Sequence, residues 1–245
     1  MTTKKNELAV TETLPAYMKN IDENDTRGNE NITKDDLVIP RLNVIQALSP
    51  EIKKNDPMFI EGAEQGMLFN TVTRELYKNG VTIIPVTYEM QHLVWRDRKL
   101  GGGFGGSFET TEDAEAYIVE MAEEGWEAVD TPTHLCLMLH DNKLTEIAIA
   151  MPKSKAKVSR QFNSVIRMIG GPRFSRAYKF LGAEDKNNAG EDFWNVRFEQ
   201  AGYVSEPVFK IAEKLYEDLL SGEVKYNVDQ DDADTDEQPK EKTNF

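Results

Sequence analysis

The chain contains little cysteine, little histidine and no long apolar run. Of its 245 residues, Cys136 is the only cysteine and three are histidines. A single cysteine excludes an intrachain disulfide and is typical of a reducing compartment. No apolar stretch approaches the ~18 residues that a membrane-spanning helix needs, and the first residues lack the apolar core of a signal peptide. We therefore expect a cytoplasmic protein with no membrane partner, in whatever cell hosts it.

Motifs for catalysis and cofactor binding are also scarce. The sequence has neither a nucleophile elbow nor a phosphate-loop lysine motif. Gly101, Gly103 and Gly106 match the dinucleotide-binding spacing, but a true fingerprint follows an apolar strand and opens directly onto a helix. Here basic residues precede the glycines, and the helix expected next is rich in carboxylates, which repel phosphate. We predict no catalytic residue, no enzymatic activity and no cofactor, and interpret the glycines as a flexible loop that closes over a ligand.

The histidines and the cysteine raise the question of a metal site. His134, Cys136 and His140 fall on one face of a predicted strand, because side chains alternate with period two. A closed zinc site needs a fourth ligand, and the remaining histidine, His92, lies on another predicted strand. We therefore predict a half-buried strand face here and no metal.

Charge is unevenly distributed along this acidic chain, whose net charge is −14. Between residues 152 and 179 there are eight bases and no acid. Residues 227–245 instead hold seven acids and two bases, end on Phe245, and contain too little apolar surface to fold. A basic block beside an acidic tail predicts a protein that binds a polyanion and regulates that binding itself. The alternative is an ordinary acidic protein with one solvated basic face.

Period-two patterns and β-branched residues dominate the middle of the chain. The predicted strands are 37–48, 66–73, 81–95, 134–140, 144–151 and 193–198. We predict a mainly β fold with added helices, namely an OB-fold-like barrel of five to six antiparallel strands. Residues 1–34 are predicted to be a flexible segment, 35–226 the folded domain, and 227–245 a disordered acidic tail.

Three helices are expected among these strands, at residues 110–124, 155–169 and 205–221. The first opens on a capping-box pattern of Thr110 and Asp113. In the second, Val158, Phe162, Val165 and Ile169 share one face, which we expect to dock on the sheet. Its bases lie on the opposite face, so the helix is predicted to present a ridge of positive charge to solvent.

Two segments alternate cations with aromatic rings, a mixture suited to single strands. Cations bind phosphates, and rings stack on unpaired bases. One segment runs from 173 to 180 and the other from 95 to 99, and the rings in both have an alternative reading as core residues. The predicted DNA-binding residues are Lys153, Lys155, Lys157, Arg160, Arg167, Arg173, Phe174, Arg176, Tyr178, Lys179, Trp95, Arg96, Arg98 and Lys99.

Several short motifs form one combined pattern along the chain. They are Ile39-Pro40-Arg41-Leu42-x-Val44-x-Gln46-Ala47-Leu48-Ser49-Pro50, Phe69-Asn70-Thr71-Val72-Thr73, Ile83-Ile84-Pro85-Val86, Trp95-Arg96, Ser159-Arg160 and the acidic tail ending in Phe245. Together they resemble phage single-stranded DNA-binding proteins. The resemblance implies an OB-fold, no enzymatic activity, and binding of single-stranded DNA during phage replication and recombination. It also implies a tail that recruits replication proteins such as polymerase or helicase-primase. Lys240 and Lys242 depart from the pattern, because acids usually continue close to the final aromatic residue.

The predicted function is therefore sequence-tolerant binding of single-stranded DNA, with a tail that competes for the same groove. The tail residues expected to do so, or to bind partners, are Asp229, Asp231, Asp232, Asp234, Asp236, Glu237 and Phe245. Two alternatives remain open: a recombination mediator or strand-annealing protein, and a protein-interaction module whose basic face meets an acidic partner. The sequence also leaves a homodimer open.

Overall fold

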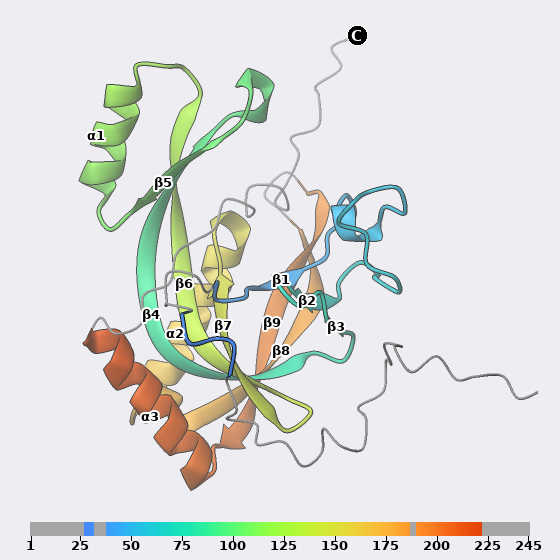
Figure 1. The fold of residues 1–245 in the computed structure, drawn as a ribbon, viewed down its shortest axis with the longest axis vertical. Coiled ribbons are helices and arrows are strands. Elements are labelled where there is room, and N and C mark those ends of the chain that lie inside the picture. Colours follow the sequence, from blue (N-terminus) through green and yellow to red (C-terminus); the bar gives the residue numbers. More distant parts are fainter. Residues whose placement is uncertain (1–26, 32–37, 187–189, 222–245) are drawn as a thin grey trace, which may run out of the picture. The chain divides into compact units, whose positions relative to one another are not determined.

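The computed structural model describes residues 27–31, 38–186 and 190–221 (Figure 1). The chain divides into two units, residues 1–37 and 38–245. In the first unit the described residues form a short exposed turn, in which the amide of Gly28 donates to the carboxylate of Glu30. Of the predicted flexible segment 1–34 only residues 27–31 are described, and the predicted tail lies wholly outside the described residues.

The second unit is built from two antiparallel sheets. The smaller has the order β1-β2-β3 and comprises β1 (Leu42–Val44), β2 (Leu68–Asn70) and β3 (Leu76–Tyr77). The larger has the order β7-β6-β4-β8-β9, with β5 also paired to β4. Its strands are β4 (Val81–Arg96), β5 (Phe104–Phe108), β6 (Trp126–His140), β7 (Lys143–Ala150), β8 (Arg176–Lys186) and β9 (Asp192–Tyr203).

The small sheet links the two edge strands of the large one, which makes the unit barrel-like. On one side Arg41 forms a parallel bridge with Ala148 of β7. On the other side the Gln46 amide donates to the Trp194 carbonyl of β9 (2.6 Å) and accepts from the Trp194 amide (3.0 Å). Side-chain bonds thus replace a strand ladder where β1 meets β9.

Two helices cover opposite faces of the large sheet. The second helix, α2 (Ala156–Ile169), buries Phe162 completely against the rings of Tyr178, Phe180 and Phe198, with centroids 4.8–5.2 Å apart. The third, α3 (Glu206–Leu220), packs on the other face through Ala212 and Leu215. Because neighbouring residues of a strand point to opposite faces, β4 supplies both cores, with Ile83 on one face and Ile84 on the other.

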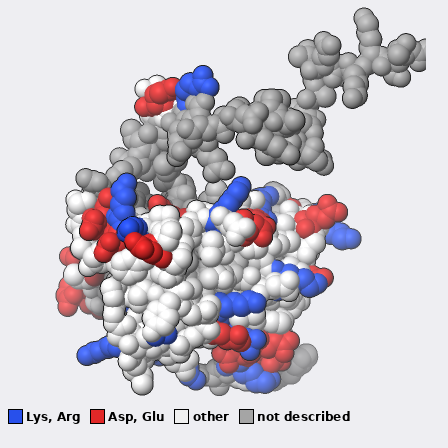
Figure 2. Space-filling view, turned by 90° about the horizontal axis from the view of Figure 1, so that it is seen from below, with Lys and Arg blue, Asp and Glu red and all other residues white. Residues whose placement is uncertain are grey.

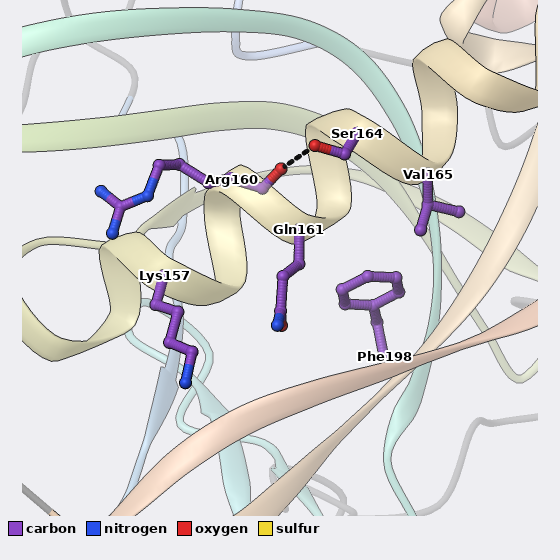
Figure 3. Close-up of a pocket in the computed structure, with 6 residues that line it drawn as sticks. All are labelled: Lys157, Arg160, Gln161, Ser164, Val165 and Phe198. Atoms are coloured by element: carbon purple, nitrogen blue, oxygen red, sulfur yellow. Dashed lines mark hydrogen bonds between the residues drawn. The ribbon is translucent and has the colours of Figure 1, made fainter.

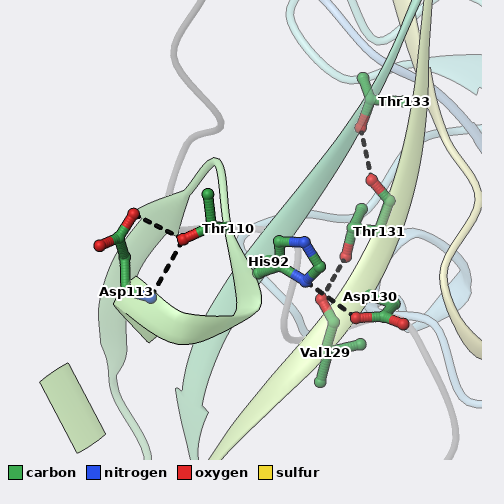
Figure 4. A network of polar contacts seen from close by, with 7 residues as sticks. All are labelled: His92, Thr110, Asp113, Val129, Asp130, Thr131 and Thr133. Carbon is green, nitrogen blue, oxygen red and sulfur yellow. Dashed lines mark hydrogen bonds and ion pairs between the residues drawn. The ribbon is translucent and has the colours of Figure 1, made fainter. Parts of the chain in front are cut away.

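Beyond these cores, β4, β5 and β6 extend as an arm that carries α1 (Thr111–Met121) (Figure 1). The amide of Asp113 donates to the Thr110 hydroxyl (3.1 Å), which closes the first turn as the capping pattern predicted. On the same arm His92 and Asp130 face each other across β4 and β6, 2.9 Å apart (Figure 4). Short 3-10 turns complete the unit: η3 (Pro50–Ile52), η4 (Arg98–Leu100), η5 (Lys153–Lys155) and η6 (Arg173–Ser175).

The predicted fold class, mainly β with added helices, is confirmed. All three predicted helices occur within a few residues of their expected ends, and the hairpin of β6 and β7 turns at Asp141 and Asn142, both with positive φ. The number of strands differs, because the described residues form nine instead of five to six.

One of the unpredicted strands, β5, occupies part of the glycine-rich loop. The backbone at Gly105 approaches α1 so closely that a Cβ would lie 2.8 Å from the Tyr117 ring. Packing, rather than closure over a ligand, therefore accounts for this glycine, and the prediction of a flexible loop was wrong over β5.

Candidate nucleic-acid interface

A hollow of about 540 Å³ lies between α2 and β9. Its lining comprises Lys157, Arg160, Gln161, Ser164, Val165 and Phe198. Gln161 and the Phe198 ring point toward each other across the space, while Lys157 and Arg160 stand at one end of it (Figure 3). Phe198 is partly exposed here, although its other contacts reach the Phe162 ring in the core. The hollow therefore combines an aromatic floor with a cationic rim.

The cations of this rim are free to meet an anionic ligand. Lys157 and Arg160 are exposed, as is Arg167 further along α2 outside the hollow, and none of the three forms an ion pair with the residues that the structure describes. The charge of Lys157 does reach Asp185, whose pKa is lowered mainly by hydrogen bonds from Asn195 and the Lys186 amide and slightly by this lysine. On the face drawn in Figure 2, acids and bases are interspersed and separated by wide uncharged areas.

A buried polar network fixes α2 to the sheet. The Arg173 guanidinium donates to Nδ1 of His134 (2.7 Å) and to the Asn163 side-chain carbonyl (2.8 Å). Because arginine can only donate, Nδ1 of His134 accepts, and its Nε2–H donates to the Ser159 hydroxyl (2.8 Å). Burial, and then the charge of Arg173, lower the pKa of His134 from 6.5 to about 3. The imidazole is therefore neutral at physiological pH.

Four predicted DNA contacts belong to the interior instead. Tyr178 is 1 % exposed and Phe174 is 6 % exposed, so neither ring can stack on a base without unfolding the core. The prediction that they are stacking platforms was wrong. Lys155 is 7 % exposed, and Arg173 is partly buried and held by its hydrogen bonds to His134 and Asn163. The alternation of cations and rings from residue 173 onward arises because these residues form η6 and then β8, a strand whose rings face the core.

The remaining bases of the block do not share one surface. Lys153 is exposed in η5, next to the start of α2. Lys179 is exposed too, but it alternates with Tyr178 and Phe180, whose rings pack against α2. Its side chain therefore leaves β8 on the opposite face from the hollow. The structure therefore does not place all the predicted cations in a single groove.

The second predicted cluster lies at the far end of β4. Thirteen residues separate Ile83, which pairs with Tyr178, from Arg96, or about 40 Å of strand at 3.3 Å per residue. There the Trp95 ring packs on Phe104 (4.5 Å), and Arg96 forms an ion pair with Glu123 (2.9 Å). Lys99 is exposed, and the Arg98 side chain lies outside the described residues. This cluster belongs to the arm and does not extend the hollow.

Several residues of the hollow were not predicted as part of a site. Phe198 was assigned only to a strand, and Gln161 and Ser164 were given no role, although Gln161 follows Arg160 and Phe198 follows Arg197 in the sequence. The helical spacing of Lys157, Arg160, Gln161 and Ser164 places all four on one flank of α2, a signal that was available.

The face of β6 that carries His134 and Cys136 is more deeply buried than the predicted half-buried face, because every residue from 131 to 138 is buried. His134 and Cys136 are fully buried, and His140 lies 3.5 Å from Glu75 and 3.7 Å from Asp141. Within the described residues, no helix combines the length and the apolar character needed to cross a bilayer.

The comparisons with known proteins give one result. Neither the curated proteins nor the solved structures include a match to the chain. A family model described as Pam3 phage gp34-like protein matches residues 3–225, which span the barrel-like unit and most of the chain. The chain therefore belongs to the Pam3 phage gp34-like family of phage proteins.

Proposed function

We propose that this phage protein binds single-stranded DNA in the hollow between α2 and β9, without sequence preference, during replication or recombination in the host cytoplasm. The observation that carries the proposal is that the partly exposed Phe198 ring lines the same hollow as Lys157 and Arg160. Single-strand binders need this combination, since every base has a face that stacks and every nucleotide carries a phosphate. We expect binding only, with no chemical step on the DNA.

Binding requires no rearrangement of the helix. The ring contacts of Phe162 and the hydrogen bonds from His134 to Ser159 and Arg173 already hold α2 on the sheet. A rim fixed in this way loses little freedom when it meets phosphates, which favours affinity.

The acidic tail completes the proposal. As a polyanion it competes with DNA for Lys157, Arg160 and Arg167, and displacement by DNA frees it for polymerase or helicase-primase partners. Its residues lie outside the described ones, so this part rests on the charge pattern of the sequence.

The test is fluorescence anisotropy of a labelled 15-nucleotide oligo-dT across a salt series. Replacing both Lys157 and Arg160 with glutamine lowers the affinity for oligo-dT. It also reduces the slope of log affinity against log salt concentration by about 1.4, since each phosphate contact to a single strand contributes about 0.7. The matched control replaces Lys53 and Lys54, two exposed lysines of the small-sheet region, with glutamine.

The control variant distinguishes DNA binding at the hollow from a general attraction of DNA by the charge of the surface. If both double variants change affinity and slope equally, the protein attracts DNA only through its overall field, and the hollow is not the site. If the intact chain retains no oligo-dT at low salt, the proposed function is wrong.

A further inference from the structure

We infer that Tyr203, with Arg176 stacked on it, forms a second platform for a nucleobase on the same face of the sheet as the hollow. The inference rests on the proposed function and extends it from one contact to a track along β9. The first observation is an exposed aromatic ring. Tyr203, at the last position of β9, is 75 % exposed.

A β-bulge determines the direction of this ring. On β9, Gln200 pairs with Tyr178 and Gly202 pairs with Ala177, so Ala201 has no partner across the ladder. In a regular strand Tyr203 and Phe198, five residues apart, would point to opposite faces. The extra residue restores Tyr203 to the face of Phe198, and bulges commonly redirect a side chain at functional positions in this way.

The partner strand confirms the direction. Arg176 lies opposite Tyr203 and alternates with Tyr178 and Phe180, whose rings contact Phe162 of α2. Its guanidinium carbon stands 3.9 Å from the centroid of the Tyr203 ring, and its Nη2 donates to the Tyr203 hydroxyl. Arg176 and Tyr203 therefore lie on the side of the sheet that α2 covers.

The pair has the chemistry of a base-stacking site. The guanidinium covers one face of the ring and leaves the other to stack on a base, which every nucleotide offers. No carboxylate of the described residues lies within ion-pair distance of Arg176, so its charge is available to the neighbouring phosphate. A solvent-exposed tyrosine held by an arginine is more ordered than a free one, which lowers the entropy lost on binding.

The spacing between the two platforms suits a short single strand. Because Ala201 is bulged, Phe198 and Tyr203 lie opposite Phe180 and Arg176, four residues apart on β8, or about 13 Å at 3.3 Å per residue. At the 3.4 Å rise of one strand in a duplex this equals about four nucleotides, and fewer when the strand is extended. An oligo-dT of 15 nucleotides therefore covers both platforms.

The experiment compares Tyr203→Ala, Tyr203→Phe and the control Tyr216→Ala in the full chain by anisotropy with 15-nucleotide oligo-dT. Removing the ring of Tyr203 weakens binding about fivefold to 150-fold, the effect of losing one stacked base, and leaves the salt slope unchanged. Tyr203→Phe keeps the ring and binds within about twofold of the parent chain. Tyr216 is a partly exposed tyrosine of α3, on the opposite side of the sheet, and its loss has no effect.

Each other outcome has a defined meaning. If Tyr203→Ala binds like the parent while the Lys157 and Arg160 double variant is weakened, the second platform is wrong and the proposed function stands. If Tyr203→Phe loses as much as Tyr203→Ala, the hydroxyl contact with Arg176 matters and stacking does not. If the parent chain fails to bind, both are wrong.

Discussion

Acidification to pH 5.5 is expected to destabilise the protein through one side chain, His134. Its pKa is lowered from 6.5 to about 3 by burial and, secondarily, by the charge of Arg173. The folded state therefore excludes a proton that the unfolded state binds once the pH falls below 6.5. Stability from this group is fully present above pH 6.5 and is lost progressively between pH 6.5 and 3.

The magnitude follows from the two pKa values. One proton taken up only by the unfolded chain costs 1.36 kcal/mol per pH unit, so moving from pH 7.5 to 5.5 lowers the free energy of unfolding by about 1.4 kcal/mol. His134 is fully buried, so solvent does not screen the effect. Keeping the pH at 5.5 also leaves this acidic chain with net charge, which helps solubility.

Urea unfolding at both pH values, followed by circular dichroism at fixed ionic strength, measures the change. Glu51 and Glu146 have raised pKa values and oppose the loss of stability caused by His134. Their carboxyl groups bind protons more tightly in the folded state, which stabilises the folded protein in acid. Comparison with His134→Gln removes these shared contributions, because glutamine retains hydrogen-bonding groups for Ser159 and Arg173 but does not titrate. The reasoning is refuted if the parent and His134→Gln lose equal stability on acidification.

Two further predictions concern packing and the tail. Gly182→Ala should destabilise by about 1–3 kcal/mol or more, because its Cβ would overlap the Gly66 carbonyl oxygen, and an unchanged urea midpoint would contradict that close approach. Deleting residues 229–245 should raise the affinity for oligo-dT at low salt, measured by anisotropy, since the competing polyanion is lost; unchanged or weaker binding would refute competition by the tail.

Local patterns predicted the helices and the hairpin well. The capping residue Thr110, the apolar face around Phe162 and the turn at Asp141 and Asn142 act over a few residues, so the sequence alone contains their cause. The strands were predicted less completely. The arm half of β6 and all of β8 were missed. In β6 the acids Glu127 and Asp130 interrupt the apolar pattern, and its partner β4 lies at least 30 residues away in the sequence, while in β8 Arg176 and Lys179 interrupt the apolar pattern.

The candidate site was predicted only in part, for a related reason. Exposed cations such as Lys157 and Arg160 follow from helical spacing, and the sequence placed them on an outer ridge. Which rings accompany them depends on which face of β8 and β9 the core occupies. Tyr178 and Phe174 were expected at the surface and lie in the core, while Phe198 lines the hollow.

By itself the sequence determined the mainly β class, the three helices and the concentration of bases before residue 180, because composition and periodicity act locally. The tertiary structure decided which of those bases share a surface and which rings reach it. A single unpaired residue, Ala201, turns Tyr203 toward the face of Phe198. Such a change of face depends on how two strands pair, which no local pattern in either strand encodes.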